Sequence, residues 1–481
     1  MESRHKEPSL ILSLLPIFFL IILLAANVYI FSDDASYGPN QIALILSAAF
    51  AAVLSLKLKY RWEEILDAIV KSISSAMSAI LILLMIGALA GTWLISGVVP
   101  AMIYYGLEIL NPTIFLFAAV IVSAVVSLAT GSSWSTAATI GIALMGIGQA
   151  LGIHEGVIAG AIISGAYFGD KMSPLSDTTN LAPAMAGTDL FTHIRYMALT
   201  TGPSIIITLI IFLIWGFSID GNAALGTVSE VQQAIKSKFE INLFLFVVPA
   251  AVIFLIIKKM PALPALLIGT LLAGVIAIIF QPQIVMAVAE SDVFSIKTAY
   301  TAVMKAMFTE TNVATGNAMV DELLTASGME GMLSTVWLIV CAMIFGGVVE
   351  GNGMLKKIAG TIIGFAHSTG SLIAATAGTC ITFNLTASDQ YIAIVVPGRM
   401  YSKEFEDRGL APENLSRTLE DSGTVTSVLI PWNTCGAYQS SVLGVATLTY
   451  LPYCFFNIIS PFMTILFGYA NIKIKRIEKE D

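Results

Sequence analysis

The chain has 481 residues, of which 57% are hydrophobic and 12% are charged, and its net charge is −8. Soluble domains carry about 25% charged residues, so this composition excludes an ordinary globular protein and indicates a polytopic membrane protein. The scarcity of basic residues excludes a nucleic-acid-binding face, and four widely spaced cysteines in apolar runs favour neither a disulfide frame nor a metal cluster.

The first half of the chain predicts full membrane spans that alternate with interrupted segments. A retained first helix is expected at residues 10–31, because this apolar run can cross a bilayer and lacks a small-residue cleavage site. Three further spans are expected at 41–58, 73–96 and 196–217. Residues 60–71 mix charged and apolar positions at helical spacing and predict an amphipathic interfacial helix.

Two interrupted segments stand between those spans. Residues 113–152 hold two apolar arms around the polar centre TGSSWST at 130–136, which predicts a re-entrant hairpin. Residues 154–190 predict a broken helix, because Pro174 and Pro183 deny a continuous one. Polar, irregular backbone is tolerated at membrane depth only where it lines a cavity or binds something.

The second half repeats this order after a polar linker loop at 218–240, which we expect outside the cell. Its spans are expected at 241–257, 262–280, 333–350 and about 450–470, with a mixed segment at 295–308 and a polar loop at 309–331. A second hairpin is expected at 361–401 around the polar centre NLTASDQ, and a second broken helix at 413–447. The two series, 1–217 and 241–481, therefore read as a weak internal repeat.

Charge placement predicts how the two repeats are related. If both hairpins are re-entrant and the N terminus is cytoplasmic, 19 of the 24 Lys and Arg residues fall on the inside, as the positive-inside rule requires. The second repeat then starts outside and the first starts inside, so the repeats are inverted and both termini are cytoplasmic. The fold class we expect is an all-α polytopic membrane protein of two inverted-topology repeats, each with a re-entrant hairpin and a broken transmembrane helix.

Inverted repeats would gather hydroxyl, carbonyl and carboxylate oxygens near the middle of the bilayer. Such ligands suit a hard cation such as Na⁺. The candidate ion- or substrate-binding residues are Thr130, Gly131, Ser132 and Ser133 from the first hairpin, Asp170, Ser173, Asp177, Thr178 and Asn180 from the first broken helix, Thr386, Ser388 and Asp389 from the second hairpin, and Asp421, Ser422, Thr424 and Asn433 from the second broken helix.

One buried acid can hold a proton or a sodium ion but not readily both, and this competition is sufficient for exchange. Asp170 is the first candidate for that acid, with Asp421 as a tentative second Na⁺ ligand; Asp389 and Glu420 are alternatives for the complementary acid. Structural roles remain open: Asp170 could pair with Lys171, Asp177 and Asp389 could cap helices, and Glu420 could be solvated. The sequence shows no nucleophile–base pair and no phosphate-binding loop, so it does not favour an enzyme.

The interrupted segments resemble the NhaC-type Na⁺/H⁺ antiporters of the ion transporter superfamily. The resemblance is carried by GSSWSTAATIGIA at 131–143, ISGAYFGDKMSPLSDTTNLAPAMAGTDLFTHIRYM at 163–197 and LEDSGTVTSVLIPWNTCGAY at 419–438. It implies a multi-pass protein of the bacterial or archaeal cytoplasmic membrane, a homodimer, an elevator-like movement and no cofactor beyond the transported Na⁺ and H⁺.

Within this family, some members resemble sodium-coupled malate/lactate exchangers. A small carboxylate is therefore the alternative substrate. Lys171 and Arg399 are the only basic side chains expected near the site, and this scarcity favours cations alone. A channel or sensor is the least favoured class, because paired broken helices are typical of transporters.

Overall fold

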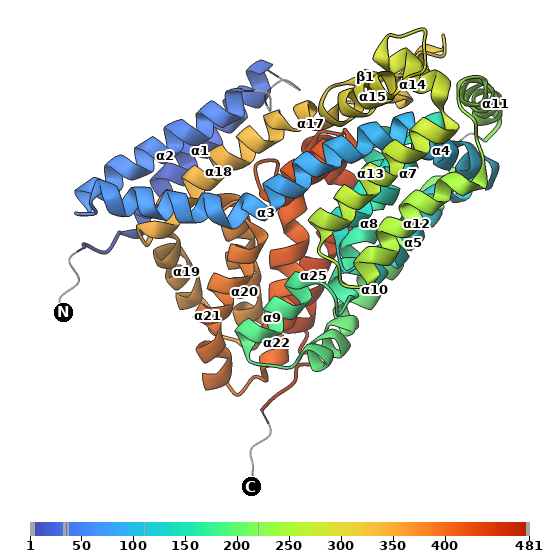
Figure 1. Cartoon of the computed structure of the whole chain (residues 1–481). Helices are drawn as coiled ribbons and strands as arrows, with labels where there is room; N and C mark the ends of the chain where they lie inside the picture. Colours follow the sequence, from blue (N-terminus) through green and yellow to red (C-terminus); the bar gives the residue numbers. More distant parts are fainter. Residues whose placement is uncertain (1–4, 32–34, 36–37, 110, 220, 478–481) are drawn as a thin grey trace.

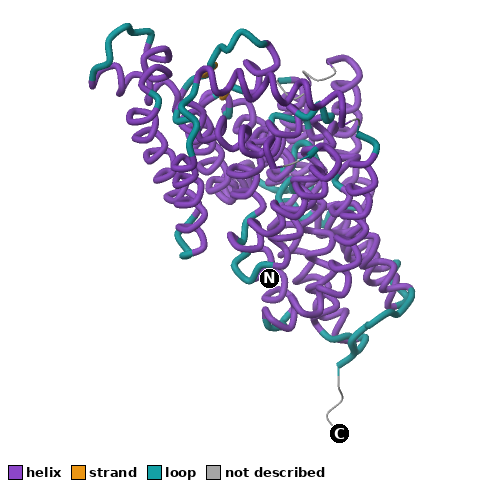
Figure 2. Tube along the Cα trace, turned by 90° about the vertical axis from the view of Figure 1, so that its right-hand side faces the viewer, coloured by secondary structure: helices purple, strands orange, loops and turns teal. Residues whose placement is uncertain are grey.

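The chain forms an almost entirely helical structure (Figure 2), described here by a computed structural model that covers residues 5–31, 35, 38–109, 111–219 and 221–477. The first half contains α1 (Leu10–Phe31), α2 (Pro39–Lys57), α3 (Trp62–Ile95), α4 (Val98–Ile109), α5 (Pro112–Thr130), α6 (Ser133–Thr136), the π-helix η2 (Ala137–Gly141), α7 (Ile142–Ala150), α8 (Glu155–Met172), α9 (Asp177–Ala186), α10 (Leu190–Phe217) and α11 (Gly221–Lys238).

The second half begins with η3 (Leu243–Phe246), α12 (Val247–Ile257), α13 (Ala262–Phe280), α14 (Pro282–Ala289) and α15 (Ile296–Phe308). A small antiparallel pair, β1 (Thr311–Asn312) with β2 (Thr325–Ala326), encloses α16 (Ala318–Leu323). There follow α17 (Gly328–Gly331), α18 (Leu333–Gly351), α19 (Met354–Gly364), α20 (Thr369–Thr386), α21 (Gln390–Asp407), α22 (Pro412–Leu419), the π-helix η4 (Glu420–Thr424), η5 (Ser427–Leu429), α23 (Thr434–Leu443), α24 (Thr447–Tyr450), η6 (Leu451–Tyr453) and α25 (Phe455–Tyr469).

Seven helices among the described residues are long and apolar enough to cross a membrane, or up to nine if each of two bent pairs counts as one span. Their outward faces carry exposed Ile, Leu and Phe side chains, as lipid-facing helices require. The chain is therefore an all-α polytopic membrane protein, as the sequence predicts. The inverted relation of the two repeats is not tested by these observations and stays a prediction.

The helices pack in two groups (Figure 1). The first group consists of α1, α2, α3, α13 and α18, with α3 running across the molecule. The second group consists of α5, α8, α9, α10, α20, α21, α22 and α25, and it combines helices from both halves of the sequence. The first broken helix (α8 and α9) and the first part of the second (α22 and η4) belong to this second group, whereas α23 packs against α3 and α18 of the first group.

Several segments differ from the expected secondary structure. The helices α4 and α14 were not expected, and the last span is bent between Tyr453 and Phe455. Residues 60–71 do not form a separate interfacial helix: no Pro or Gly lies between Trp62 and Ile86, and α3 runs continuously from Trp62 to Ile95. Residues 221–238 form α11 instead of a loop; Val231 and Ile235 lie four residues apart and are fully buried. The second hairpin region begins at Thr369 rather than 361, because residues up to 364 belong to α19.

The expected breaks lie close to their predicted positions. The first hairpin region is interrupted after Thr130, and the first broken helix between Met172 and Asp177. The second hairpin region is interrupted between Thr386 and Gln390, and the second broken helix passes through two irregular turns before α23. The re-entrant placement of the hairpins in a bilayer stays a prediction.

Candidate functional site

The first interruption brings a serine-rich turn against Asp170. Gly131 ends α5 with a φ of 71°, which glycine adopts without strain, and a Cβ there would lie 2.6 Å from the Cβ of Leu175. Ser132 then caps α6 by accepting a hydrogen bond from the Ser135 amide at 3.1 Å. This turn places the next residue, Ser133, directly beside Asp170.

Asp170 is held by two hydrogen bonds from a single residue. The backbone N–H of Ser133 donates to Oδ2 of Asp170 at 3.0 Å, and the Ser133 hydroxyl donates to the same oxygen at 2.6 Å. Only 9% of Asp170 is exposed. Both donors stabilise the ionised carboxylate, as does the N-terminal end of α6. Asp170 therefore does not pair with its neighbour Lys171.

The break in the first broken helix is closed by its own polar side chains. The Thr179 hydroxyl donates to the carbonyl oxygens of Lys171 and Asp170 at 3.0 and 3.2 Å. The Ser173 hydroxyl donates to the Leu128 carbonyl at 2.8 Å, and the Asn180 amide donates to Ser176 O at 2.7 Å. The Asn180 side chain also donates to the Pro174 carbonyl at 3.0 Å. These side-chain contacts hold the two sides of the break together, so Ser173 and Asn180 act in the structure of the break.

The second interruption is fixed to the second broken helix. The Asn433 side-chain amide donates to the Asn384 carbonyl at 3.1 Å, and the Thr434 amide donates to the Ser388 carbonyl at 2.9 Å. Asp389 caps α21 by accepting from the Tyr391 amide at 2.8 Å and the Ile392 amide at 3.0 Å. The capping alternative for Asp389 is thus present, and it leaves the second carboxylate oxygen for other contacts.

Other candidates of the second half bond to their own helices or stay without a partner. The Thr386 hydroxyl donates to the Thr382 carbonyl at 2.7 Å, and the Ser422 hydroxyl donates to the Thr418 carbonyl. The hydroxyls of Ser388 and Thr424 are buried and have no hydrogen-bond partner among the described residues.

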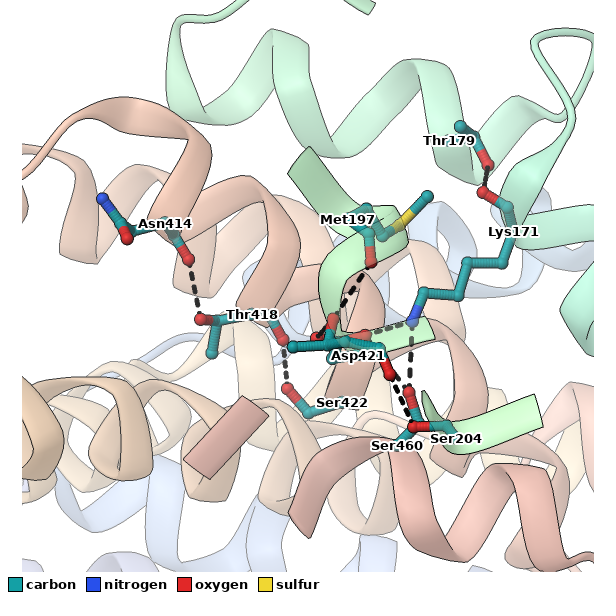
Figure 3. Close-up of polar contacts among 10 residues, drawn as sticks. Lys171, Thr179, Met197, Ser204, Asn414, Thr418, Asp421, Ser422 and Ser460 are labelled. Atoms are coloured by element: carbon teal, nitrogen blue, oxygen red, sulfur yellow. Dashed lines mark hydrogen bonds and ion pairs between the residues drawn. The ribbon is translucent and has the colours of Figure 1, made fainter. Parts of the chain in front are cut away.

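Asp421 lies in a separate buried cluster with Lys171 (Figure 3). Both side chains are completely buried and form an ion pair that joins positions 250 residues apart. Ser460 of α25 contacts both partners at 3.1 Å, and the Thr200 hydroxyl of α10 donates to Oδ2 of Asp421 at 2.8 Å. The ring of Phe456 lies 5.7 Å from the Lys171 ammonium. This cluster was not foreseen from the sequence.

A cavity of about 590 Å³ lies between the two helix groups and brings many of the candidates together. Its wall includes residues of α3, of the loop between α12 and α13, and of both interrupted regions. The lining residues that carry charge or hydrogen-bonding groups include Thr130, Ser132, Ser135, Asp170, Ser176, Asp177, Thr178, Lys259, Asp389, Gln390 and Thr434. Asp421, Ser422, Thr424 and Asn433 do not line it.

Four helices begin at this cavity, so partial positive charge from their N-termini gathers on its wall. The helices α6, α9, α21 and α23 start beside it, and their N-caps are Ser132, Ser176, Asp389 and Asn433. Each helix N-terminus carries partial positive charge. The three carboxylates on the wall, those of Asp170, Asp177 and Asp389, balance that charge.

Comparison with known proteins identifies the family. A sequence model of the Na⁺/H⁺ antiporter family matches residues 165–472, which include the breaks in both broken helices. The chain belongs to the Na⁺/H⁺ antiporter family. This antiporter is 38% identical to the Na⁺/H⁺ antiporter NhaC of Alkalihalophilus pseudofirmus, over 90% of its length and 91% of the relative.

Relatives of this antiporter have different named substrates. It is 36% identical to a malate-2H⁺/Na⁺-lactate antiporter of Bacillus subtilis, over 90% of each chain. It is 35% identical to the arginine/ornithine antiporter ArcD of Halobacterium salinarum, over 99% of its length and 95% of the relative. The solved structure of Neisseria gonorrhoeae MtrF aligns over 95% of both chains at 12% identity, but its TM-score of 0.40 supports no comparison of individual elements.

Proposed function

We propose that this antiporter exchanges Na⁺ for H⁺ by competition at Asp170. One observation supports the proposal most directly: a buried carboxylate on the cavity wall accepts both of its hydrogen bonds from Ser133. The antiporter relatives make sodium and protons the first substrates to test.

In this mechanism the ionised Asp170 is the state that receives Na⁺. Hydroxyl oxygens of Thr130, Ser132 and Thr178 lie on the same wall and supply hard ligands for the dehydrated cation. A proton that arrives on Asp170 removes the negative charge, and the site then loses its affinity for Na⁺. Alternating exposure of one such site to the two sides would couple the two gradients.

We further propose Asp389 as the acid that complements Asp170, because both carboxylates line one cavity. Asp421 is bound by Lys171, Ser460 and Thr200, so its charge is already compensated. We assign the Lys171–Asp421 pair to holding α8, α10, α25 and the second broken helix together during transport.

The wall of the cavity includes Lys259, in a loop that the positive-inside rule places in the cytoplasm. On this basis the cavity faces the cytoplasm in the conformation described. We also propose that both termini are cytoplasmic, that the protein forms a homodimer, and that it moves in an elevator-like manner.

Everted membrane vesicles provide the test of this function. Vesicles that contain the protein and hold a respiration-driven pH gradient should show a collapse of that gradient when Na⁺ is added, and Asp170→Asn vesicles should show none. Full exchange by Asp170→Asn, with equal protein in the membrane, would refute the role of Asp170.

A second candidate is sodium-coupled exchange of a small carboxylate. The cavity volume of about 590 Å³ far exceeds the space that a single Na⁺ needs, and four helix N-termini favour an anion whenever Asp170 carries a proton. The malate/lactate relative points to the same class.

Labelled malate and lactate in proteoliposomes separate the two candidates. Sodium-dependent uptake of either acid would establish the second candidate. Sodium-driven proton movement without uptake of any acid in the panel would leave cation exchange alone.

A further inference from the structure

The helix α23 connects the two interrupted regions that border the cavity. It continues the second broken helix, which is largely buried; Glu420, at the start of η4, is 0% exposed rather than solvated. The beginning of α23 is tied to the second hairpin region, because the Thr434 amide donates to the Ser388 carbonyl at 2.9 Å. One turn later α23 carries Tyr438, which is fully buried.

Tyr438 holds the turn of the first hairpin region by two contacts. Its ring stacks on the indole of Trp134, with 3.9 Å between the ring centres and 21° between the ring planes. Its hydroxyl donates to the Trp134 carbonyl at 2.9 Å, across 304 positions of the sequence. The indole N–H of Trp134 has no hydrogen-bond partner among the described residues. The specific contacts that orient Trp134 therefore come from Tyr438.

Trp134 lies directly after Ser133, in the four-residue helix α6. A helix this short has almost no internal hydrogen bonds, so its neighbours decide where it lies. The Ser133 amide and hydroxyl donate to Oδ2 of Asp170 at 3.0 and 2.6 Å. A displacement of α6 by about 1 Å would take the hydroxyl contact out of the range of a good hydrogen bond. Whatever holds Trp134 therefore also holds Ser133 on Asp170.

The π-helix η2, which follows α6, strengthens this connection. It packs against α23 as well, and a Cβ added at Gly141 would lie 3.0 Å from Cδ2 of Leu443. The turn of the first hairpin region thus rests on α23 at two successive places. The same helix is bonded to the second hairpin region, whose Asp389 lines the cavity together with Asp170.

We propose that Tyr438 is a positioning residue of the ion site. Through Trp134 it keeps Ser133 in contact with Asp170, and through α23 it links this turn to the second hairpin region. Without these contacts the serine-rich turn moves, and the oxygens around Asp170 are no longer preorganised for Na⁺. The affinity of the site for Na⁺ then falls. This assignment rests on the proposed Na⁺/H⁺ exchange at Asp170.

Hydrogen–deuterium exchange of the purified full-length protein tests, independently of transport, whether Tyr438 holds the turn. Peptides that cover residues 131–141 should exchange faster in Tyr438→Leu, which removes both contacts. Tyr438→Phe keeps the ring and loses only the hydroxyl, so its increase should be smaller. Tyr401→Phe is the matched control, because the buried Tyr401 hydroxyl bonds to Thr379 and to Ala375 O of α20. Unchanged exchange of these peptides in both Tyr438 variants would overturn the proposal.

Transport kinetics in everted vesicles test whether this contact acts on the ion site. Tyr438→Phe should raise the apparent KM for Na⁺ about two- to tenfold, as loss of one neutral hydrogen bond implies, with the maximal rate per protein molecule largely preserved. Tyr401→Phe should keep the wild-type KM. In a Ser133→Ala background, Tyr438→Phe should add little, because both substitutions act through the same contact with Asp170.

A purely structural role of Tyr438 would lower the amount of folded protein without changing the KM. A wild-type KM in Tyr438→Phe and Tyr438→Leu would therefore contradict the assignment. An increase of the same size with and without the Ser133 hydroxyl would also contradict it, because Tyr438 would then act elsewhere. Absence of sodium-driven proton movement in the wild type would refute the proposed function itself, and the hydrogen-exchange measurement would still decide whether Tyr438 holds the turn.

Discussion

At the scale of single residues, the proposed exchange depends on the hydrogen bonds that Ser133 donates to Asp170. Two donors converge on one carboxylate oxygen, at 3.0 and 2.6 Å, in a place that is 9% exposed. Hydrogen bonds to an ionised group stabilise it against protonation. The strength of these two bonds therefore sets the balance between proton and Na⁺ at this acid.

Ser133→Ala removes the shorter of these bonds and should make the proton harder to displace. A hydrogen bond to a charged group contributes about 1.5–3 kcal/mol, which corresponds to a rise of about one to two units in the pH of half-maximal exchange. Initial rates of exchange measured against pH provide the check. Thr376→Val is the matched control, because the Thr376 hydroxyl bonds to Leu372 O within its own helix. An unshifted profile in Ser133→Ala would count against the mechanism.

The Lys171–Asp421 pair should obey the energetics of a buried ion pair. Lys171→Met or Asp421→Asn alone leaves one buried charge without its partner and should cost about 3–5 kcal/mol of stability. The double variant removes both charges and should recover much of that loss. Thermal unfolding in detergent, followed by size-exclusion chromatography, measures the comparison; a double variant less stable than both single variants would rule out direct compensation.

The residue roles were only partly predictable from the sequence. Asp170 could be placed beside the serine-rich turn because both occur at helix breaks. The partner of Lys171 could not be chosen by spacing, because it lies 250 residues away. The available signal was a lone lysine at membrane depth, which requires a buried acid as its partner.

At the scale of elements, Gly and Pro mark some of the breaks but do not cause one wherever they occur. Pro183 was expected to interrupt the first broken helix, yet it lies inside α9, and Pro203 lies inside α10. Gly131 and Pro174 mark breaks that the structure contains.

The charged segment 60–71 suggested a separate helix, yet nothing in it stops α3. The polarity of residues 221–238 predicts a loop, but the spacing of Val231 and Ile235 indicates a helix with one buried face, which the structure contains as α11.

Gly131 provides a test of the first turn. Gly131→Ala should strain a residue with a φ of 71° and force its Cβ to within 2.6 Å of Leu175, which displaces the turn that carries Ser133. Strain of this kind costs about 1–3 kcal/mol. We expect lower exchange and a lower unfolding temperature.

Gly444→Ala is the matched control for this substitution. Gly444 has a φ of 69° but nothing within 4 Å of an added Cβ. It should suffer the same backbone strain with exchange largely preserved. Equal transport defects in the two variants would show that contact with Leu175 is unimportant.

At the scale of the whole molecule, composition alone established a polytopic helical membrane protein. Which helices form each group could not be predicted, because the second group joins α5, α8 and α10 to α20, α21 and α25 from the other half of the chain. The orientation of the halves is still inferred from charge.

Cysteine labelling tests that orientation. The four native cysteines are buried, so their background reactivity should be low. A membrane-impermeant maleimide should label Lys297→Cys in intact cells, whereas Lys403→Cys should be labelled only after permeabilisation. Labelling of both variants in intact cells would contradict the inverted arrangement.

The most direct test of the central claim is proton release from the purified protein when Na⁺ binds. In weakly buffered detergent solution with a pH-sensitive dye, NaCl should release protons from the wild type and from Glu155→Gln, whose carboxylate lies exposed at the start of α8. Asp170→Asn should release fewer protons or none, because it has no carboxyl for the two ions to share. Release of the full wild-type amount by Asp170→Asn would show that Na⁺ and H⁺ compete elsewhere.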